Sequence, residues 1–205
     1  MCARYEPVLD GERFRQAFHA QLPLLAQDPD VRPGGTSAFV RLRAGQREAL
    51  GGTFGLMPHW AKPDLFRYTY NARSETVATK PSFRSAWRHA QHCIVPVEAI
   101  WEPDWRSGHH IAARITRADG KPMGIAGLWE ERTIEASGEI SFSFTLLTIN
   151  ADEHALMKLM HRPEKEKRMV VILPEDRYDA WLQAPAGSSE EFLLQYPAER
   201  MIAAA

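Results

Sequence analysis

Strand-like segments dominate the middle of this 205-residue chain, and most follow one another without helices between them. They end at turn signals, of which Asp119-Gly120 is a dipeptide typical of β-hairpins. A parallel sheet would need a crossover, usually a helix, after each strand. The sequence therefore predicts an α+β fold with a mostly antiparallel, curled, barrel-like sheet and short flanking helices. The predicted strands are 38–43, 52–57, 93–97, 109–115, 123–129, 141–149 and 169–173.

Helical patterns are short and flank the strands. Two phenylalanines at i,i+4 spacing after Asp10 predict an N-terminal helix. A second helix is predicted at 82–90, where Trp87 falls on the apolar face. Further helices are predicted at 152–160, at 174–182 with Pro174 in the first turn, and after Ser188 or Ser189.

Composition is that of an average soluble protein, with 44% hydrophobic and 25% charged residues. We expect one domain over 1–205, with a core at 1–183 and a C-terminal loop, short helix and tail at 184–205. A leader pattern and a long apolar run are both missing, so we expect a cytoplasmic protein without a membrane partner. We also expect a monomer. Cys2 and Cys93 are expected to stay reduced, and no metal or cofactor is predicted.

Positive charge is concentrated in one segment. The formal net charge is −1, which argues against a protein that coats nucleic acid indiscriminately. Between 62 and 93, six basic residues outnumber two acidic ones, so this segment carries +4 and the remainder −5. It could offer a basic face to an anionic ligand, or it could be an ordinary solvated helix face.

The second residue is a cysteine, and its position could give it unusual chemistry. A residue this small normally permits removal of Met1, which would leave Cys2 with a thiol and a free α-amine on adjacent carbons. With reference pKa values of about 8.5 and about 8, each group is partly nucleophilic near neutrality. Such a 1,2-aminothiol can attack a carbonyl as an amine and close a ring through sulfur. The alternative is that Cys2 is a frayed terminal residue without a role.

Seven motifs in order carry a resemblance to a known family. After Cys2 they are GLMPHWA at 55–61, NARSET at 71–76, PSFR at 81–84, CIVP at 93–96 with Trp101-Glu102, AGLWE at 126–130, and His161 ahead of RMVVIL at 168–173. Over nearly its whole length the chain resembles the SOS-response-associated peptidase (SRAP) domain, the abasic-site-processing family.

The resemblance implies an activity and a partner. Proteins of this family bind abasic sites in single-stranded DNA, and their N-terminal Cys condenses with the ring-opened sugar to form a thiazolidine crosslink. The same role is implied for Cys2 after Met1 removal, with lyase-type and autopeptidase activities also implied. Single-stranded DNA would be the partner, so the protein would associate with the nucleoid when bound to DNA.

The same resemblance indicates which residues would transfer protons in this chemistry. Sugar ring opening, amine attack, loss of water and thiol closure each move a proton. Glu102 matches the family's catalytic glutamate, and His161 matches its histidine. From the residues alone, Glu102 could equally be solvated surface, with Glu98, Glu130 and Asp104 as nearby rivals, and His161 could simply end a helix.

DNA contacts are implied in several segments. Asn71 and Arg73 match the pair that holds the abasic nucleotide, and two residues apart in an extended segment they would share one face. Asn71 is grouped with Cys2, Glu102 and His161 as catalytic. The alternative for 71–73 is a polar turn before a capped helix. Further expected contacts are Arg4, Lys80, Arg84, Trp60 and Pro33, with Thr148 lining the site.

Departures from the family pattern bear on local DNA contacts and on rate and remove no catalytic residue, and two other functions stay open beside the leading one. Ala3, Phe54 and Pro103 replace a usual Gly, Trp and Trp, and 162–167 adds a charged loop beside His161. One alternative is an N-terminal-nucleophile cysteine peptidase or amidohydrolase that uses Cys2 on an amide. The other is a module that binds single-stranded DNA without covalent chemistry.

Overall fold

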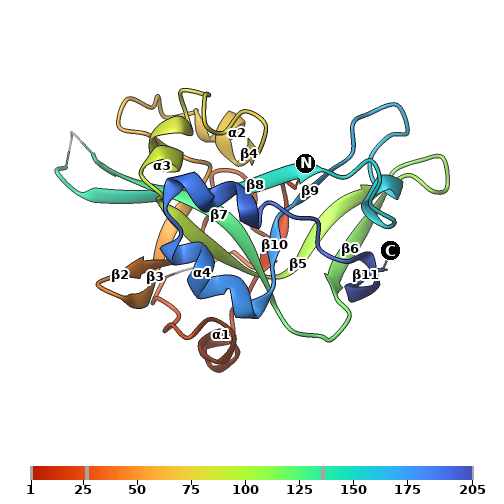
Figure 1. Ribbon diagram of the computed structural model, residues 1–205, viewed down its shortest axis with the longest axis horizontal. Helices are drawn as coiled ribbons and strands as arrows, with labels where there is room; N and C mark the ends of the chain where they lie inside the picture. The colour runs from red at the N-terminus through yellow and green to blue at the C-terminus, as the bar shows by residue number, and fades with distance from the viewer. Residues whose placement is uncertain (1, 26–27, 135–136, 205) are drawn as a thin grey trace.

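Five strands close into a barrel in the order β7-β8-β3-β2-β5, with β5 pairing again with β7. The computed structural model describes residues 2–25, 28–134 and 137–204 (Figure 1). The barrel strands are β2 (Thr36–Arg43), β3 (Gln46–Phe54), β5 (His92–Asp104), β7 (Met123–Thr133) and β8 (Ile140–Asn150).

Six more strands extend this barrel. They are β1 (Tyr5–Pro7), β4 (Asn71–Arg73), β6 (Ile111–Arg117), β9 (Arg168–Val170), β10 (Ile172–Leu173) and β11 (Met201–Ala204). Only the β3–β8 and β4–β8 pairings among the described strands are parallel. The predicted fold, a mostly antiparallel curled sheet, is therefore confirmed.

The helices are short, as expected. They are α1 (Gly11–Phe18), α2 (Phe66–Thr69), α3 (Arg84–Arg88) and α4 (Tyr178–Gln183), with 3₁₀ segments at Met157–Leu159, Glu175–Arg177, Ala186–Phe192 and Ala198–Arg200. Asp10 caps α1 by accepting a hydrogen bond from the amide of Arg13 at 2.7 Å. None of the described helices is long and apolar enough to cross a membrane.

Aromatic side chains fill the core between the barrel strands. Phe54 is fully buried, stacks on Phe144 at 5.6 Å between ring centroids, and meets Tyr5 and Tyr70 edge-on. The departure from Trp at position 54 therefore places a smaller ring in the core, away from direct contact with a ligand.

Several predicted elements differ from the structure in extent or type, and two of these differences have a clear local cause. The strand predicted at 52–57 ends at Phe54, because Gly55 has φ of +126° and a Cβ there would lie 2.5 Å from Phe66. The helix predicted at 152–160 is only the 3₁₀ segment Met157–Leu159. The Asp152 carboxylate accepts from the amide of Lys167 at 2.8 Å instead of capping a helix, so the backbone turns away.

The C-terminal segment contributes a strand that the sequence did not indicate. Residues 201–204, expected to lie in a tail, form β11 and pair antiparallel with β6. Four residues are too few for an alternating pattern to stand out, although Met201 is buried and Ile202 is half exposed.

Pairing between β1 and β5 positions the start of the chain. Tyr5 lies opposite Ile100, and the carbonyl of Arg4 accepts from the amide of Trp101 at 3.0 Å. Since antiparallel strands run past each other, residues before Arg4 lie beside the end of β5, where Glu102 is found.

Candidate functional site

Cys2 is held by a residue from the middle of the chain. The side-chain Nδ2 of Asn71 donates a hydrogen bond to the carbonyl oxygen of Cys2 at 2.7 Å. Both residues are buried, with Cys2 1% and Asn71 8% exposed. Cys2 is therefore an ordered part of the core cluster, which excludes a frayed end at this residue. Met1, whose removal was predicted, lies outside the described residues.

The thiol of Cys2 is held in its neutral form. Burial raises its pKa well above the usual value, and the negative charge of Glu102 raises this pKa further. The thiol also lies 3.5 Å from the carbonyl oxygen of Arg4, close enough for a weak S–H···O hydrogen bond. At neutral pH this sulfur is a proton donor and not a thiolate.

Glu102 and His161 form a pair beside Cys2. Glu102 lies near the end of β5 and is 3% exposed. Its Oε2 lies 2.9 Å from Nε2 of His161, whose side chain is 18% exposed. The carboxylate is thus directed toward an imidazole that reaches solvent, an arrangement suited to carrying protons between the core and the surface.

The backbone fixes the position of His161. Its φ of +61° lies in the left-handed region, which a non-glycine residue adopts only when its surroundings require it. Its amide donates to the carbonyl of Pro103 at 2.6 Å, and its carbonyl accepts from Nζ of Lys167 at 3.2 Å. These two contacts keep the imidazole opposite Glu102. His161 does not end a helix, because no α-helix forms at 152–160.

Asn71 and Arg73 lie on the same short strand, as expected. β4 runs parallel to β8, with Arg73 opposite Thr148, while Ala72 between them is buried. The extended prediction for 71–73 is therefore confirmed over the polar-turn alternative. Asn71 reaches inward to Cys2, whereas the Arg73 side chain remains 45% exposed.

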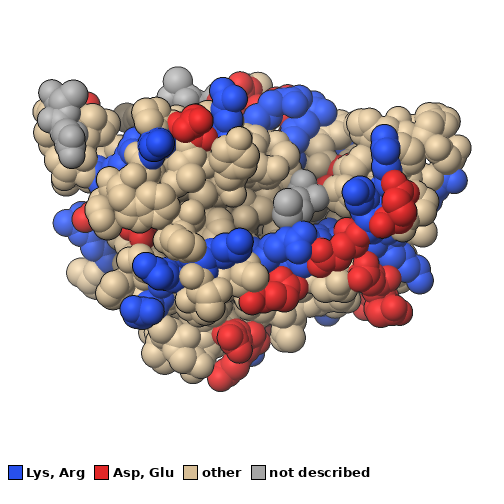
Figure 2. All heavy atoms as spheres, turned by 90° about the horizontal axis from the view of Figure 1, so that it is seen from above, with Lys and Arg blue, Asp and Glu red and all other residues tan. Residues whose placement is uncertain are grey.

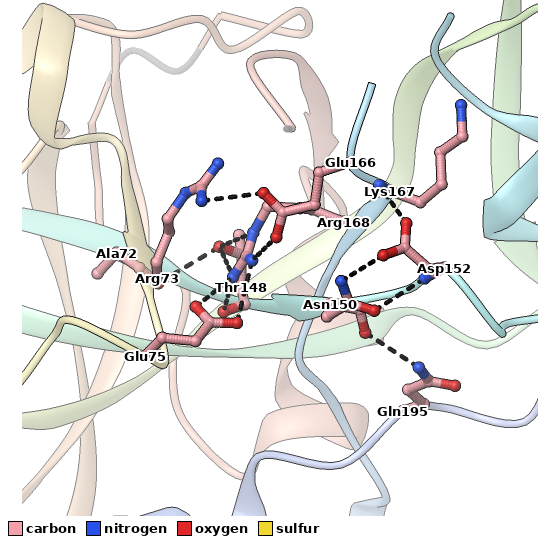
Figure 3. Close-up of polar contacts among 10 residues, drawn as sticks. All are labelled: Ala72, Arg73, Glu75, Thr148, Asn150, Asp152, Glu166, Lys167, Arg168 and Gln195. Atoms are coloured by element: carbon pink, nitrogen blue, oxygen red, sulfur yellow. Dashed lines mark hydrogen bonds and ion pairs between the residues drawn. The ribbon is translucent and has the colours of Figure 1, made fainter. Parts of the chain in front are cut away.

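Arg73 belongs to a charged cluster, drawn in Figure 3. Its Nη1 lies 3.0 Å from Oε2 of Glu166, whose Oε1 lies 2.7 Å from Nη1 of Arg168. Arg168 is also paired with both carboxylate oxygens of Glu75, at 3.1 and 3.0 Å, and donates to the carbonyl of Thr148 at 2.8 Å.

A cleft of about 670 Å³ opens beside His161. It is lined by Arg73, Pro103, Trp105, His110, His161, Arg162, Lys165, Glu166 and Arg168. Basic side chains and one tryptophan thus dominate the lining, a combination that suits phosphates and stacked bases. On the face shown in Figure 2, Lys and Arg side chains form a band across the middle, and Asp and Glu side chains border it on the lower and right-hand side.

The remaining predicted DNA contacts are not among the residues that line this cleft. Trp60 is 49% exposed, Arg84 and Lys80 are exposed, and Pro33 is half-buried. Thr148 is fully buried behind Arg168 and donates to the carbonyl of Ala72 at 3.4 Å, so its hydroxyl supports the site from behind.

Arg4 lies in a different hollow. Its Nε pairs with Asp30 at 2.6 Å and its guanidinium lies 4.4 Å from the ring centre of Trp101. The hollow that it lines also contains Glu98 and Arg114 and shares no lining residue with the cleft beside His161.

Several residues of the site were not singled out in the sequence. The pKa of the Tyr70 hydroxyl is raised first by burial and then by electrostatic interaction with Cys2 and Glu102, so this ring lies near both. Trp105 and His110 come from the loop after β5, where only their position just after Glu102 could have indicated them. Within the described part of the chain, no group of three or more His, Cys, Asp or Glu could hold a metal ion.

Solved structures share this fold. A crystal structure of a Bordetella bronchiseptica protein matches with a TM-score of 0.91 and 47% identity, covering 100% of this chain and 99% of that one. A Bacteroides thetaiotaomicron protein matches with a TM-score of 0.84 and 21% identity, covering 98% and 90%. At the lower identity the likeness is one of fold alone.

Curated relatives carry informative names. Abasic site processing protein YoaM of Bacillus subtilis is 33% identical over 156 residues, which is 72% of this chain and 63% of the relative. Abasic site processing protein HMCES of Gallus gallus is 26% identical over 172 residues, covering 72% and 49%. The matched region thus spans less than two thirds of either relative. The family model described as SOS response associated peptidase (SRAP) matches residues 1–205. This chain therefore belongs to the SRAP family.

Proposed function

We propose that this protein processes abasic sites in single-stranded DNA by covalent capture through Cys2, once Cys2 carries a free α-amine. The observation that carries the proposal is the convergence of Asn71 and Glu102 on Cys2, with Glu102 in turn 2.9 Å from His161. These residues come from four separate segments of the chain. The names of the curated relatives support abasic DNA as the substrate.

The neutral thiol supports a definite order of steps. Because the sulfur is protonated at neutral pH, the α-amine is the first nucleophile. Its nitrogen bonds to the aldehyde carbon of the opened sugar, and loss of one water leaves an imine. The sulfur then bonds to the same carbon while its proton passes to the nitrogen. The product is a thiazolidine ring, and the net reaction releases one water.

Glu102 and His161 divide the proton transfers. Glu102 accepts the proton that the amine loses and returns a proton to the departing hydroxyl, because its carboxylate lies near enough to Cys2 for its charge to raise the pKa of the thiol. His161 protonates the sugar ring oxygen as the ring opens, because its imidazole lines the cleft.

Asn71 supplies an acceptor as well as a donor. Its Oδ1 is buried and accepts no hydrogen bond from the described residues, which is a costly arrangement in a folded protein. A donor, either the Cys2 amine freed by removal of Met1 or a hydroxyl of the bound sugar, would satisfy this oxygen. Asn71 would then hold the nucleophile and the sugar in one geometry.

The cleft gives the DNA strand its path. Arg73 faces the phosphates, and Trp105 offers a ring on which a base can stack. Because Cys2 is only 1% exposed, the groups around it must move before a sugar can reach it.

The thiol environment disfavours peptide hydrolysis through Cys2 as the main activity. A cysteine peptidase needs a thiolate, which forms where nearby cations lower the thiol pKa. Here burial and Glu102 raise that pKa. Removal of residues before Cys2 would prepare the amine, and crosslinking would be the activity that follows.

A denaturing gel tests the proposal. The protein that begins at Cys2 should give a slow-migrating band with an abasic single-stranded oligonucleotide, and Cys2→Ala should give none. Cys2→Ala keeps the α-amine, so its imine should be retained only when borohydride is added. Cys93→Ala is the matched control because it removes the other buried thiol, and it should crosslink normally. A stable band with Cys2→Ala, or none with the unmodified protein, would show the proposal to be wrong.

A further inference from the structure

Glu166 joins two arginines that differ in their access to solvent. Its two carboxylate oxygens lie 3.0 Å from Arg73 and 2.7 Å from Arg168 (Figure 3). The Arg73 side chain is 45% exposed, whereas that of Arg168 is 2% exposed. The carboxylate therefore bridges a surface cation and a buried one.

The Arg168 side chain is held in the protein interior by several contacts. Its guanidinium is paired with both oxygens of Glu75 and donates to the carbonyl and hydroxyl of Thr148. None of these contacts involves Arg73. Arg168 can therefore keep Glu166 anchored at the edge of the cleft while Arg73 exchanges its partner.

We propose that the Glu166 carboxylate takes the place of a DNA phosphate in the free protein. It forms an ion pair with Arg73, and this ion pair breaks when a DNA strand enters the cleft and a phosphate binds Arg73 instead. A carboxylate and a phosphate both present two oxygens that a guanidinium can bind. Glu166 lies in the same cleft as Arg73 and His161. This inference rests on the proposed function, because it concerns how the same site accepts its strand.

This exchange of partners should lower the affinity for DNA, and the loss of affinity can be measured. When a phosphate takes Arg73, Glu166 loses one ion pair, so the number of ion pairs does not rise. Phosphate contacts gain affinity by releasing cations from DNA, but the freed carboxylate takes up a cation in return. Glu166 should therefore weaken binding to any strand and reduce the dependence of binding on salt.

Binding of an intact single-stranded oligonucleotide, which has no aldehyde, tests this exchange without covalent chemistry. Fluorescence anisotropy of the labelled strand would be followed over a series of salt concentrations. Glu166→Gln keeps the shape of the side chain and removes its charge. Glu164→Gln, an exposed carboxylate two residues earlier, changes net charge equally and is the matched control.

Glu166→Gln should bind about two- to fivefold more tightly at low salt. The slope of log K against log salt should become steeper by up to about 0.7, the value for one phosphate on a single strand. Glu164→Gln should show a smaller gain, and in an Arg73→Ala background the two Gln variants should behave alike. Thermal unfolding would verify the fold, and Glu166→Ala would give a second test if Glu166→Gln is unstable.

Equal gains for the two Gln variants, or weaker binding by Glu166→Gln, would overturn the inference. Weaker binding would mean that Glu166 orients Arg73 instead of competing for it. Either result leaves crosslinking to abasic DNA intact, whereas failure of the unmodified protein to crosslink would contradict the proposed function itself.

Discussion

Asn71 donates a hydrogen bond from Nδ2 to the carbonyl oxygen of Cys2 at 2.7 Å, although the two residues are 69 positions apart in sequence. The contact joins the start of the chain to β4, the strand that also carries Arg73. It fixes the backbone of the residue whose amine and thiol would react. A side chain that holds a nucleophile can contribute to rate through geometry alone.

Asn71→Ala should slow crosslinking by about tenfold or more, because Cys2 loses its hydrogen bond from β4 and the sugar loses an amide. The free energy of unfolding should fall by only about 1 kcal/mol, since the lost hydrogen bond is offset by removal of the unsatisfied Oδ1. Single-turnover crosslinking and urea unfolding measure the two effects. Asn150→Ala, which removes an exposed amide paired with Asp152, is the control and should crosslink at the normal rate.

Glu102→Gln should slow crosslinking by about 100-fold while leaving the affinity for intact single-stranded DNA nearly unchanged. The carboxylate is 3% exposed and its charge raises the pKa of the Cys2 thiol, so its loss should affect chemistry more than binding. Glu98→Gln is a matched control, because Glu98 lies on the same strand but pairs with Arg13 at 2.6 Å. If Glu102→Gln changed affinity alone, its role as an acid and base would be wrong.

His92 should make the free energy of unfolding fall at acidic pH. Burial lowers its pKa from 6.5 to about 4, so between these values the unfolded chain binds a proton that the folded protein does not. Stability should therefore fall by up to about 3 kcal/mol as pH decreases from 6.5 to 4. His92→Gln should flatten this part of the curve while costing stability at pH 8, because His92 stacks on Trp181 and pairs with Ser189. The exposed His89→Gln should leave the curve unchanged.

The class of sheet was easier to predict from the sequence than the short elements that surround it. Alternating runs and the turn at Asp119-Gly120 were enough for an antiparallel curled sheet, because residue spacing on a strand is local information. The helix predicted at 152–160 failed because side chains there bind distant backbone, as Asp152 does with Lys167. β4 has only three residues and was recognised as extended through Asn71 and Arg73, whereas β11 passed unnoticed.

The residues of the candidate site could be predicted from the sequence, but the contacts between their side chains could not. Cys2, Asn71, Glu102 and His161 were all named from motifs, and the structure brings them together. Motifs do not reveal that Glu166, in the loop after His161, forms an ion pair with Arg73, because that contact depends on how the loop folds back. The burial of the Cys2 thiol was equally hidden, since terminal residues are usually exposed.

The intact mass of the denatured DNA complex tests the central claim most directly. If Cys2 reacts through both its amine and its thiol, the mass should equal that of the chain from Cys2 plus the abasic strand minus one water. Digestion should place the strand on the peptide that begins at Cys2. A stable adduct that retains Met1, or one located on any other residue, would contradict the account.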